Sequence, residues 1–327
     1  MILPHFQPFV GEHCETTAVG NLLKYDGLDL TEPMLFGLGG GLGFIYWKMK
    51  TMPVPFLGGR TKTLTRNFCQ NLNLTLEEKE TSSVNKAWDH VTDALHAGKP
   101  IGLQLDCYHL DYFSQKIHFA GHHVAMYGYD ENDAFLVDTR PQGGAVTTTL
   151  PNLALARSEK GPMSARNRSY RITGAIHDVN LPAAIPRAIH RNAEEYLNPP
   201  IQNIGYKGIL KTSVEIKNWL TSSKNPKADF THTAVMMERA GTGGALFRNL
   251  YRDFLREAYE LLRYEPLLEA HEAFTEIAGN WTRVAALFER VTGPDDTDIV
   301  DEASLTLAAI SRAEKRVMTD LYGSCSE

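Results

Sequence analysis

The sequence predicts an α+β protein whose N-terminal half mixes helices with strands and whose C-terminal half is mainly helical. Three observations predict this class: an apolar helical stripe that begins at Cys14, two strand-like segments joined by a polar turn, and long helical patterns in the second half of the chain. With 327 residues, the chain is long enough for two domains, which we place at 1–174 and 175–327.

The first expected helix covers residues 14–25. Apolar residues there recur at helical spacing, and Asp26-Gly27 provides an end signal. Residues 32–47 contain too many glycines for a stable helix interior, so we expect a loop there.

An amphipathic helix is expected over 83–97, and a strand over 101–105 follows it. Two further strands, 123–129 and 134–137, flank the turn-forming residues 130–133, which predicts a hairpin. Between 139 and 171 the composition shifts to Pro, Gly, Ser, Thr and Arg without apolar periodicity, and a possible strand resumes at 172–176. The second half then shows four helical patterns, at 214–220, 245–262, 267–291 and 299–321.

Composition and charge exclude several classes of function. The net charge of -6 and the scattered Lys and Arg residues provide no basic surface for a nucleic acid. No segment approaches the roughly 18–20 apolar residues of a membrane span, and the N-terminus lacks the pattern of a signal peptide. We therefore expect a cytoplasmic protein that binds neither nucleic acid nor membrane, and the sequence leaves its oligomeric state open.

Four cysteines lie far apart without a C-x-x-C pair, which indicates reduced thiols. Cys14 stands out because it lies at the start of an expected helix, where backbone N–H groups and the helix dipole favour the thiolate. The alternative is that Cys14 is a small buried residue.

A base and an orienting carboxylate follow on the expected hairpin. His122 precedes the first strand and Asp138 follows the second. A Cys-His-Asp set supports acyl transfer, because histidine deprotonates the thiol and the carboxylate orients the imidazole. A symmetric count about the turn places Asp138 opposite Ala125, so the two side chains would meet only diagonally or through a bulge. His123 is the alternative base.

The chain resembles papain-like cysteine peptidases and double-glycine peptidases. These enzymes share a pattern: a Cys at a helix N-terminus, a His on a strand with a Gly six residues later, and an Asp or Asn on the next strand. Gly128 and Asp138 occupy the corresponding positions after His122, which favours His122 over His123. The resemblance implies a papain-like fold for the N-terminal domain. These enzymes place an oxyanion-hole Gln six residues before the Cys. This chain has Pro8 there, so Gln7 is the candidate donor.

Residues 11–18 and 34–44 resemble the butirosin biosynthesis protein H family more closely, and the second half is similar to the uncharacterised helical domain that accompanies it. The resemblance implies an acyltransferase of antibiotic or other secondary-metabolite biosynthesis, with Cys14 as nucleophile. The acyl donor would be a thioester on an acyl-carrier protein or CoA, carried on phosphopantetheine, and the acceptor a small amine, with no other cofactor. Two alternatives stay open: a cysteine peptidase or amidase, and a non-catalytic carrier-docking protein.

Candidate substrate contacts come from two segments. Gly39, Gly40 and Gly41 belong to a glycine-rich stretch that would let a thioester arm lie against the backbone, although a tight packing turn explains them equally well. Arg248 lies on an amphipathic helix preceded by Gly241–Gly244, so it is a candidate for binding an anionic group, the alternative being an ordinary core helix. We expect the helical domain to cover the cleft and supply specificity.

Residues of metal-ligating type are frequent before and within the hairpin: Cys107, His109, Asp111, His118, His122 and His123. Their spacings match no familiar zinc motif, and the chain contains no H-E-x-x-H segment. We therefore expect no metal.

Overall fold

The structure is a computed structural model that describes residues 1–49, 52, 54–59, 63–161, 164–239 and 244–325. The chain forms two compact units, one made of residues 1–35 and 68–180 and the other of residues 36–67 and 181–327. The fold class α+β is confirmed, with the sheet in the first unit and most helices in the second.

The predicted domains, 1–174 and 175–327, differ from these units mainly in residues 36–67. This segment belongs to the helical unit because its aromatic side chains pack there: the ring of Phe36 lies 5.2 Å from that of Phe247, and the ring of Phe44 lies 5.5 Å from that of Trp281. The contact partners are more than 200 residues away in sequence. No local pattern in residues 36–67 indicates them.

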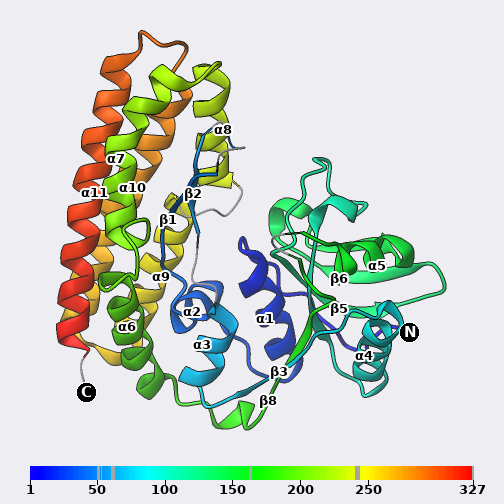
Figure 1. Ribbon diagram of the computed structural model, residues 1–327. Helices are drawn as coiled ribbons and strands as arrows, with labels where there is room; N and C mark the ends of the chain where they lie inside the picture. Colours follow the sequence, from blue (N-terminus) through cyan, green and yellow to red (C-terminus); the bar gives the residue numbers. More distant parts are fainter. Residues whose placement is uncertain (50–51, 53, 60–62, 162–163, 240–243, 326–327) are drawn as a thin grey trace. The chain divides into compact units, whose positions relative to one another are not determined.

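The first unit contains an antiparallel six-stranded sheet of order β3-β8-β4-β5-β6-β7. Its strands are β3 (Thr75–Lys79), β4 (Ile101–Leu105), β5 (His122–Tyr129), β6 (Asp133–Val137), β7 (Ala145–Thr149) and β8 (Ser169–Thr173). Figure 1 shows helix α1 (Cys14–Tyr25) on one side of these strands and helices α4 (Val84–His96) and α5 (Leu150–Ser158) on the other. The remaining elements are the short 3-10 turns η1 (Cys107–His109), η2 (Arg140–Gln142) and η3 (Ile176–Asp178).

A buried apolar cluster holds the sheet to its helices. It includes Val91 and Leu95 of α4, Leu103 of β4, and Val124 and Met126 of β5. Each strand contributes alternate residues because successive side chains point to opposite faces of a sheet. The same alternation places neighbouring residues of β5, such as His122 and His123, on opposite faces of the sheet.

The N-terminal segment pairs with β5 at Gly128. The Leu3 N–H donates to the Tyr127 carbonyl at 3.0 Å, and the Tyr129 N–H donates to the Met1 carbonyl at 2.7 Å. A Cβ atom added to Gly128 would lie 2.7 Å from the Met1 carbonyl oxygen, so glycine is required for this close approach. The glycine six residues after His122 therefore has a packing role.

Sequence patterns located most elements of the first unit. The helices expected at 14–25 and 83–97, the strand at 101–105 and the hairpin are present. Two expectations were wrong. The loop expected at 32–47 contains α2 (Glu32–Leu38) and β1 (Ile45–Trp47), and the irregular stretch 139–171 contains β7, α5 and the start of β8. Helix α2 ends before most of the glycines, which explains how it forms beside them.

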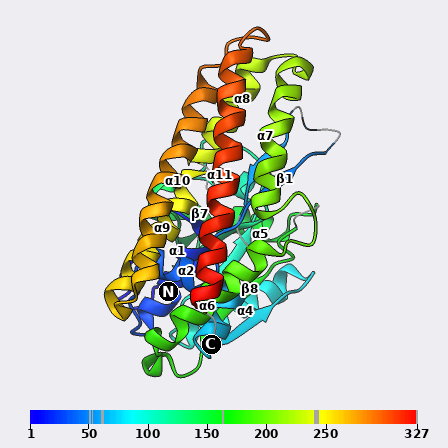
Figure 2. The same ribbon diagram turned by 90° about the vertical axis from the view of Figure 1, so that its left-hand side faces the viewer.

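The second unit consists mainly of helices: α6 (Leu181–Leu197), α7 (Gly205–Ser222), α8 (Pro226–Arg239), α9 (Ala245–Leu262), α10 (Glu265–Glu289) and α11 (Thr297–Ser324). Helix α3 (Leu64–Asn71) spans the boundary between the units, and β1 pairs with β2 (Phe56–Gly58). Figure 2 shows α7, α10 and α11 running alongside one another. Buried residues of α11 recur every three or four positions, for example Ala303, Leu307 and Ile310, as in a helix with one core-facing side. Within the described part of the chain, no helix has both the length and the apolar character needed to cross a bilayer.

Candidate active site

Cys14 is the first residue of α1, directly after the extended residue His13. Its thiol is partly exposed, whereas Cys69, Cys107 and Cys325 are buried. Burial raises the pKa of Cys69 to about 12 and that of Cys325 to about 11, so these thiols stay protonated at neutral pH. Cys14 therefore combines accessibility with a helix N-terminus, where the dipole and backbone N–H groups favour a thiolate.

The carboxylate of Glu32 fixes the loop that leads into Cys14. Its Oε1 accepts hydrogen bonds from the backbone N–H groups of Glu12 at 3.0 Å and His13 at 2.8 Å, and from the Thr16 hydroxyl at 2.8 Å. Its Oε2 accepts from the Glu12 N–H at 2.8 Å. A Cβ atom on Gly11 would lie 2.6 Å from this carboxylate, so the close approach requires glycine. Burial raises the pKa of Glu32 despite these hydrogen bonds.

Glu32 also restricts which groups can stabilise an oxyanion. The N–H groups of Glu12 and His13 already donate to this carboxylate. The Cys14 N–H is our candidate oxyanion donor in this segment because it lies at the first position of α1, on the residue that carries the thiol. Sequence reasoning missed Glu32, because nothing in the pattern connects it to a loop about 20 residues earlier.

Replacing Glu32 with glutamine is expected to lower the free energy of unfolding by about 1–3 kcal/mol, because the amide NH₂ cannot accept a hydrogen bond and leaves a backbone N–H unsatisfied. Urea unfolding measures this loss. Thr16→Val is the matched control, since it removes a single donor to the same carboxylate and is expected to cost on the order of 1 kcal/mol. Equal unfolding free energies for the wild type and Glu32→Gln would contradict the assigned role of the carboxylate.

Tyr127 is an extra residue in β5 and forms a β-bulge. The register of β5 against β6 shifts between Met126 and Gly128, and before the shift Ala125 pairs with Val137. A bulge of this kind moves the rest of the strand by one residue against its partner.

The bulge determines which histidine faces Asp138. Continuing the observed register places Asp138 opposite Val124, whereas a symmetric count of the hairpin places it opposite Ala125. Residues opposite each other share a face, and successive residues alternate. Asp138 therefore shares a face with His122, two residues before Val124, and not with His123.

The imidazole of His122 and the carboxylate of Asp138 form a buried hydrogen-bonded pair. His122 Nε2 lies 2.7 Å from Asp138 Oδ2, which leaves Nδ1 as the ring nitrogen for a thiol. The same Asp138 oxygen accepts from the Tyr112 hydroxyl at 2.8 Å, and Oδ1 accepts from the Thr139 N–H at 2.6 Å. The ring of Phe113 meets the His122 ring edge-on at 5.3 Å. These contacts fix the orientation of the imidazole.

Electrostatics favour the charged form of this pair. Burial alone lowers the pKa of His122, but the charge of Asp138 and its hydrogen bond, together with the nearby Cys107 and Cys14 sulfurs, outweigh burial and raise that pKa well above its ordinary value. Burial raises the pKa of Asp138, yet the His122 charge and the hydrogen bonds to the carboxylate bring it below its ordinary value. The site thus favours an imidazolium, which can pair with a thiolate.

Arg140 joins the loop after Asp138 to the loop before Cys14. Its backbone N–H donates to the Gly11 carbonyl at 2.8 Å, and its guanidinium donates to the Glu12 carboxylate at 2.7 Å. The segments that carry Cys14 and Asp138 are therefore connected directly. This ion pair is largely exposed, so its contribution to stability is small.

The alternative candidates in this unit lie elsewhere. His123 points away from Asp138, with its Nδ1 3.1 Å from the Tyr170 hydroxyl, so the structure brings His122 to the carboxylate and not His123. Gln7 is exposed, and its role as an oxyanion donor stays a prediction.

The predicted glycine contacts form a packed turn. Gly39, Gly40 and Gly41 are all buried, and Gly40 adopts a left-handed φ of +60° just after α2. Added Cβ atoms would lie 2.6 Å from Leu64 at Gly39 and 2.5 Å from Phe36 at Gly41. The interpretation as a surface for a thioester arm was therefore wrong. Small residues are needed here because neighbouring side chains leave no space.

Arg248 is likewise a core residue and not a substrate contact. Its side chain is 0% exposed, and its Nε and Nη2 donate to Glu314 at 2.8 and 3.0 Å. Trp281 Nε1 donates to the same carboxylate at 2.9 Å, and Tyr196 also donates to it. Gly241–Gly243, the other part of that prediction, lie outside the described residues. A guanidinium held this way cannot reach a ligand.

Comparisons with known proteins match both halves of the chain. Residues 13–139 match the family described as butirosin biosynthesis protein H, N-terminal, and residues 151–321 match the domain of unknown function DUF4872. A crystal structure assigned to a C39-like peptidase from Bacillus anthracis is similar at 17% identity and a TM-score of 0.36, covering 53% of this chain and 96% of that one. No curated protein matches the chain. The match to the butirosin biosynthesis protein H family, over residues 13–139, includes Cys14, His122 and Asp138.

Proposed function

Because the chain belongs to the butirosin biosynthesis protein H family and carries a DUF4872 domain in its second half, we propose that it is a cysteine-dependent acyltransferase of secondary-metabolite biosynthesis. The acyl or aminoacyl donor is a thioester on an acyl-carrier protein or CoA, and the acceptor is a small amine. The observation that carries the proposal is an accessible thiol at a helix N-terminus, in the same compact unit as the buried His122–Asp138 pair.

The proposed reaction has two halves with Cys14 as the covalent carrier. His122 takes the thiol proton, and the thiolate attacks the thioester carbonyl. The C–S bond to the donor then breaks, and the departing thiol takes the proton from His122. In the second half, the amine attacks the Cys14 thioester and gives its proton to His122, while the Cys14 sulfur leaves. Asp138 stabilises the imidazolium in both halves.

The first test is the rate of Cys14 alkylation by iodoacetamide between about pH 4 and 9, with the modified site identified by mass spectrometry. In the wild type, we expect Cys14 to react selectively, with the midpoint of its rate–pH profile below the roughly 8.5 of a free thiol. His122→Ala is expected to move the midpoint toward the free-thiol value, and the matched control His123→Ala is expected to leave it unchanged. An unreactive Cys14, or a free-thiol profile in all three proteins, would favour the non-catalytic binding protein.

A second experiment separates transfer from hydrolysis. The protein is incubated with aminoacyl thioesters of N-acetylcysteamine, and the intact mass reports an acyl group on Cys14. Amines are then added, and the products are quantified. Formation of amide product supports the acyltransferase. Release of free acid alone, whatever amine is present, would indicate the hydrolase, in which water resolves the acyl-enzyme.

A further inference from the structure

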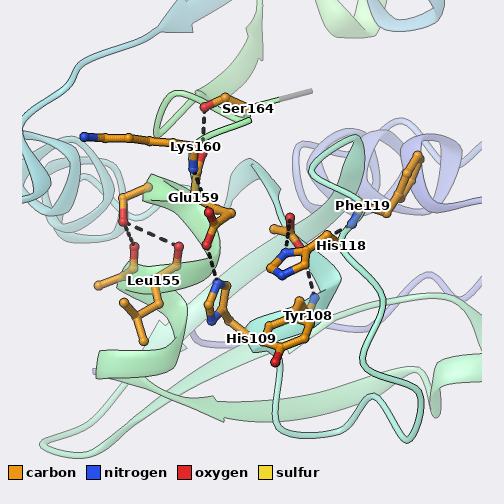
Figure 3. A network of polar contacts seen from close by, with 11 residues as sticks. Tyr108, His109, His118, Phe119, Leu155, Glu159, Lys160 and Ser164 are labelled. Carbon is orange, nitrogen blue, oxygen red and sulfur yellow. Dashed lines mark hydrogen bonds and ion pairs between the residues drawn. The ribbon is translucent and has the colours of Figure 1, made fainter. Parts of the chain in front are cut away.

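Three side chains of types that can bind a metal ion lie close together beside the hairpin, outside the proposed acyl-transfer site (Figure 3). They are His109 at the end of η1, His118 in the segment before β5, and Glu159 directly after α5. One ligand atom from each lies within 4.8 Å of the others. We propose that these three residues bind one divalent transition-metal ion, with zinc as the best match.

The donor set and its geometry suit zinc. Two imidazoles and a carboxylate, with the fourth position left to water, form one of the known zinc ligand sets. His109 Nε2 and Glu159 Oε2 are hydrogen-bonded at 2.6 Å. Zinc–ligand bonds of about 2.0–2.1 Å place tetrahedral ligand atoms roughly 3.3 Å apart. An ion would replace this hydrogen bond, and side-chain rotations would bring the three ligand atoms, which lie within 4.8 Å of one another, to that spacing.

The surroundings of His118 provide the stronger evidence. Its Nδ1 lies 3.3 Å from Asp106 Oδ2, so its Nε2 is the nitrogen available to a metal. Metal-bound histidines commonly donate their other ring N–H to a carboxylate in this way. Asp106 is only 2% exposed and accepts hydrogen bonds from the N–H groups of Tyr108 and Phe119. Although His118 itself is largely exposed, the Tyr108 ring stacks on it at 4.0 Å and holds its orientation.

The other metal-ligating types noted in the sequence lie outside this cluster. His122 pairs with Asp138, and His123 contacts Tyr170. Asp111 accepts hydrogen bonds from Thr148, Thr149 and Asn152. The sequence did not reveal Glu159 because it lies about 40 residues after His118. Only the packing of α5 against the sheet places Glu159 near the two histidines.

Such an ion would act on the segment between the two histidines. His109 and His118 bracket a stretch that carries Tyr112, which donates to Asp138, and Phe113, which contacts the His122 ring. Metal binding would join both ends of this stretch to Glu159 and so restrain the residues that orient the imidazole. The binding itself does not depend on the proposed acyl transfer.

The test is titration of chelator-treated protein with Zn²⁺ by isothermal calorimetry, in a Cys14→Ser background so that the nucleophile cannot bind the ion. We expect one Zn²⁺ per chain and a higher melting temperature with zinc. His118→Gln is expected to weaken binding by at least about 100-fold, and Asp106→Asn by roughly 10- to 100-fold. The control is His232→Gln, which changes an exposed histidine on α8 and is expected to leave binding unchanged.

Cobalt substitution provides an independent readout. Co²⁺ bound to two imidazoles and a carboxylate in a four-coordinate site is expected to give visible absorption bands that His118→Gln abolishes. No binding, or equal zinc affinity in His118→Gln and His232→Gln, would overturn the proposal and leave an ordinary ion pair between His109 and Glu159. Because these measurements use no acyl donor, their failure is distinct from failure of the proposed function.

Discussion

Replacing Asp138 with asparagine is expected to lower the turnover of acyl transfer by roughly 10²- to 10⁴-fold while Cys14 stays in place. The Asp138 carboxylate is the largest of the influences that raise the pKa of His122 against burial. The asparagine amide carries no charge. It can present either its NH₂ or its oxygen to the ring, so it does not hold the His122 imidazole in one protonation state. Steady-state kinetics with an aminoacyl thioester and an amine measure the loss.

The pH dependence provides the sharper version of this prediction. Because the pKa of His122 is well above its ordinary 6.5 in the wild type, the imidazolium that protonates the departing thiol persists through neutral pH. The alkaline limb of kcat/KM is therefore expected above neutrality. In Asp138→Asn burial dominates and lowers that pKa, so the alkaline limb moves to lower pH.

The matched control is Asp133→Asn, which changes a partly exposed carboxylate at the other end of β6. It should alter neither turnover nor the alkaline limb. If Asp138→Asn lowered activity without moving that limb, the carboxylate would not be controlling the protonation of His122. A structural loss alone lowers activity at every pH.

Arg248→Met is expected to lower the free energy of unfolding by about 3–5 kcal/mol, because it leaves the buried Glu314 carboxylate without its cationic partner. Both side chains are 0% exposed, so water cannot replace the lost interaction. Denaturant unfolding followed by circular dichroism measures the change. The double variant Arg248→Met with Glu314→Leu is expected to recover much of the loss, since it removes both buried charges.

Arg252→Met is the matched control one turn further along α9. Arg252 is partly exposed and pairs with the adjacent Asp253, so its replacement is expected to change stability by no more than about 1 kcal/mol. If Arg248→Met unfolded at the wild-type denaturant concentration and impaired only substrate use, Arg248 would be a ligand contact after all. The buried pair argues for the opposite result.

Local sequence patterns predicted the elements of the site well, because their signals lie within a few residues. The stripe after Cys14 located its helix, and the polar turn located the hairpin that carries His122 and Asp138. The assignments that failed depend on distant partners. Arg248 pairs with a carboxylate 66 residues later, and the buried glycines after α2 are explained by side chains such as Phe36 and Leu64. Such contacts follow from tertiary packing and leave no periodic trace.

The histidine that serves the carboxylate is chosen by the length of the hairpin as well as by the identity of the residues. In a hairpin of the same sequence without the bulge, the symmetric register would turn Asp138 toward the face of His123. A homologue that keeps the turn but lacks the bulge is therefore expected to have a histidine-to-aspartate spacing that is shorter by one residue. Across relatives with this turn, an even spacing should accompany a one-residue bulge between the two side chains, and an odd spacing should accompany a regular hairpin.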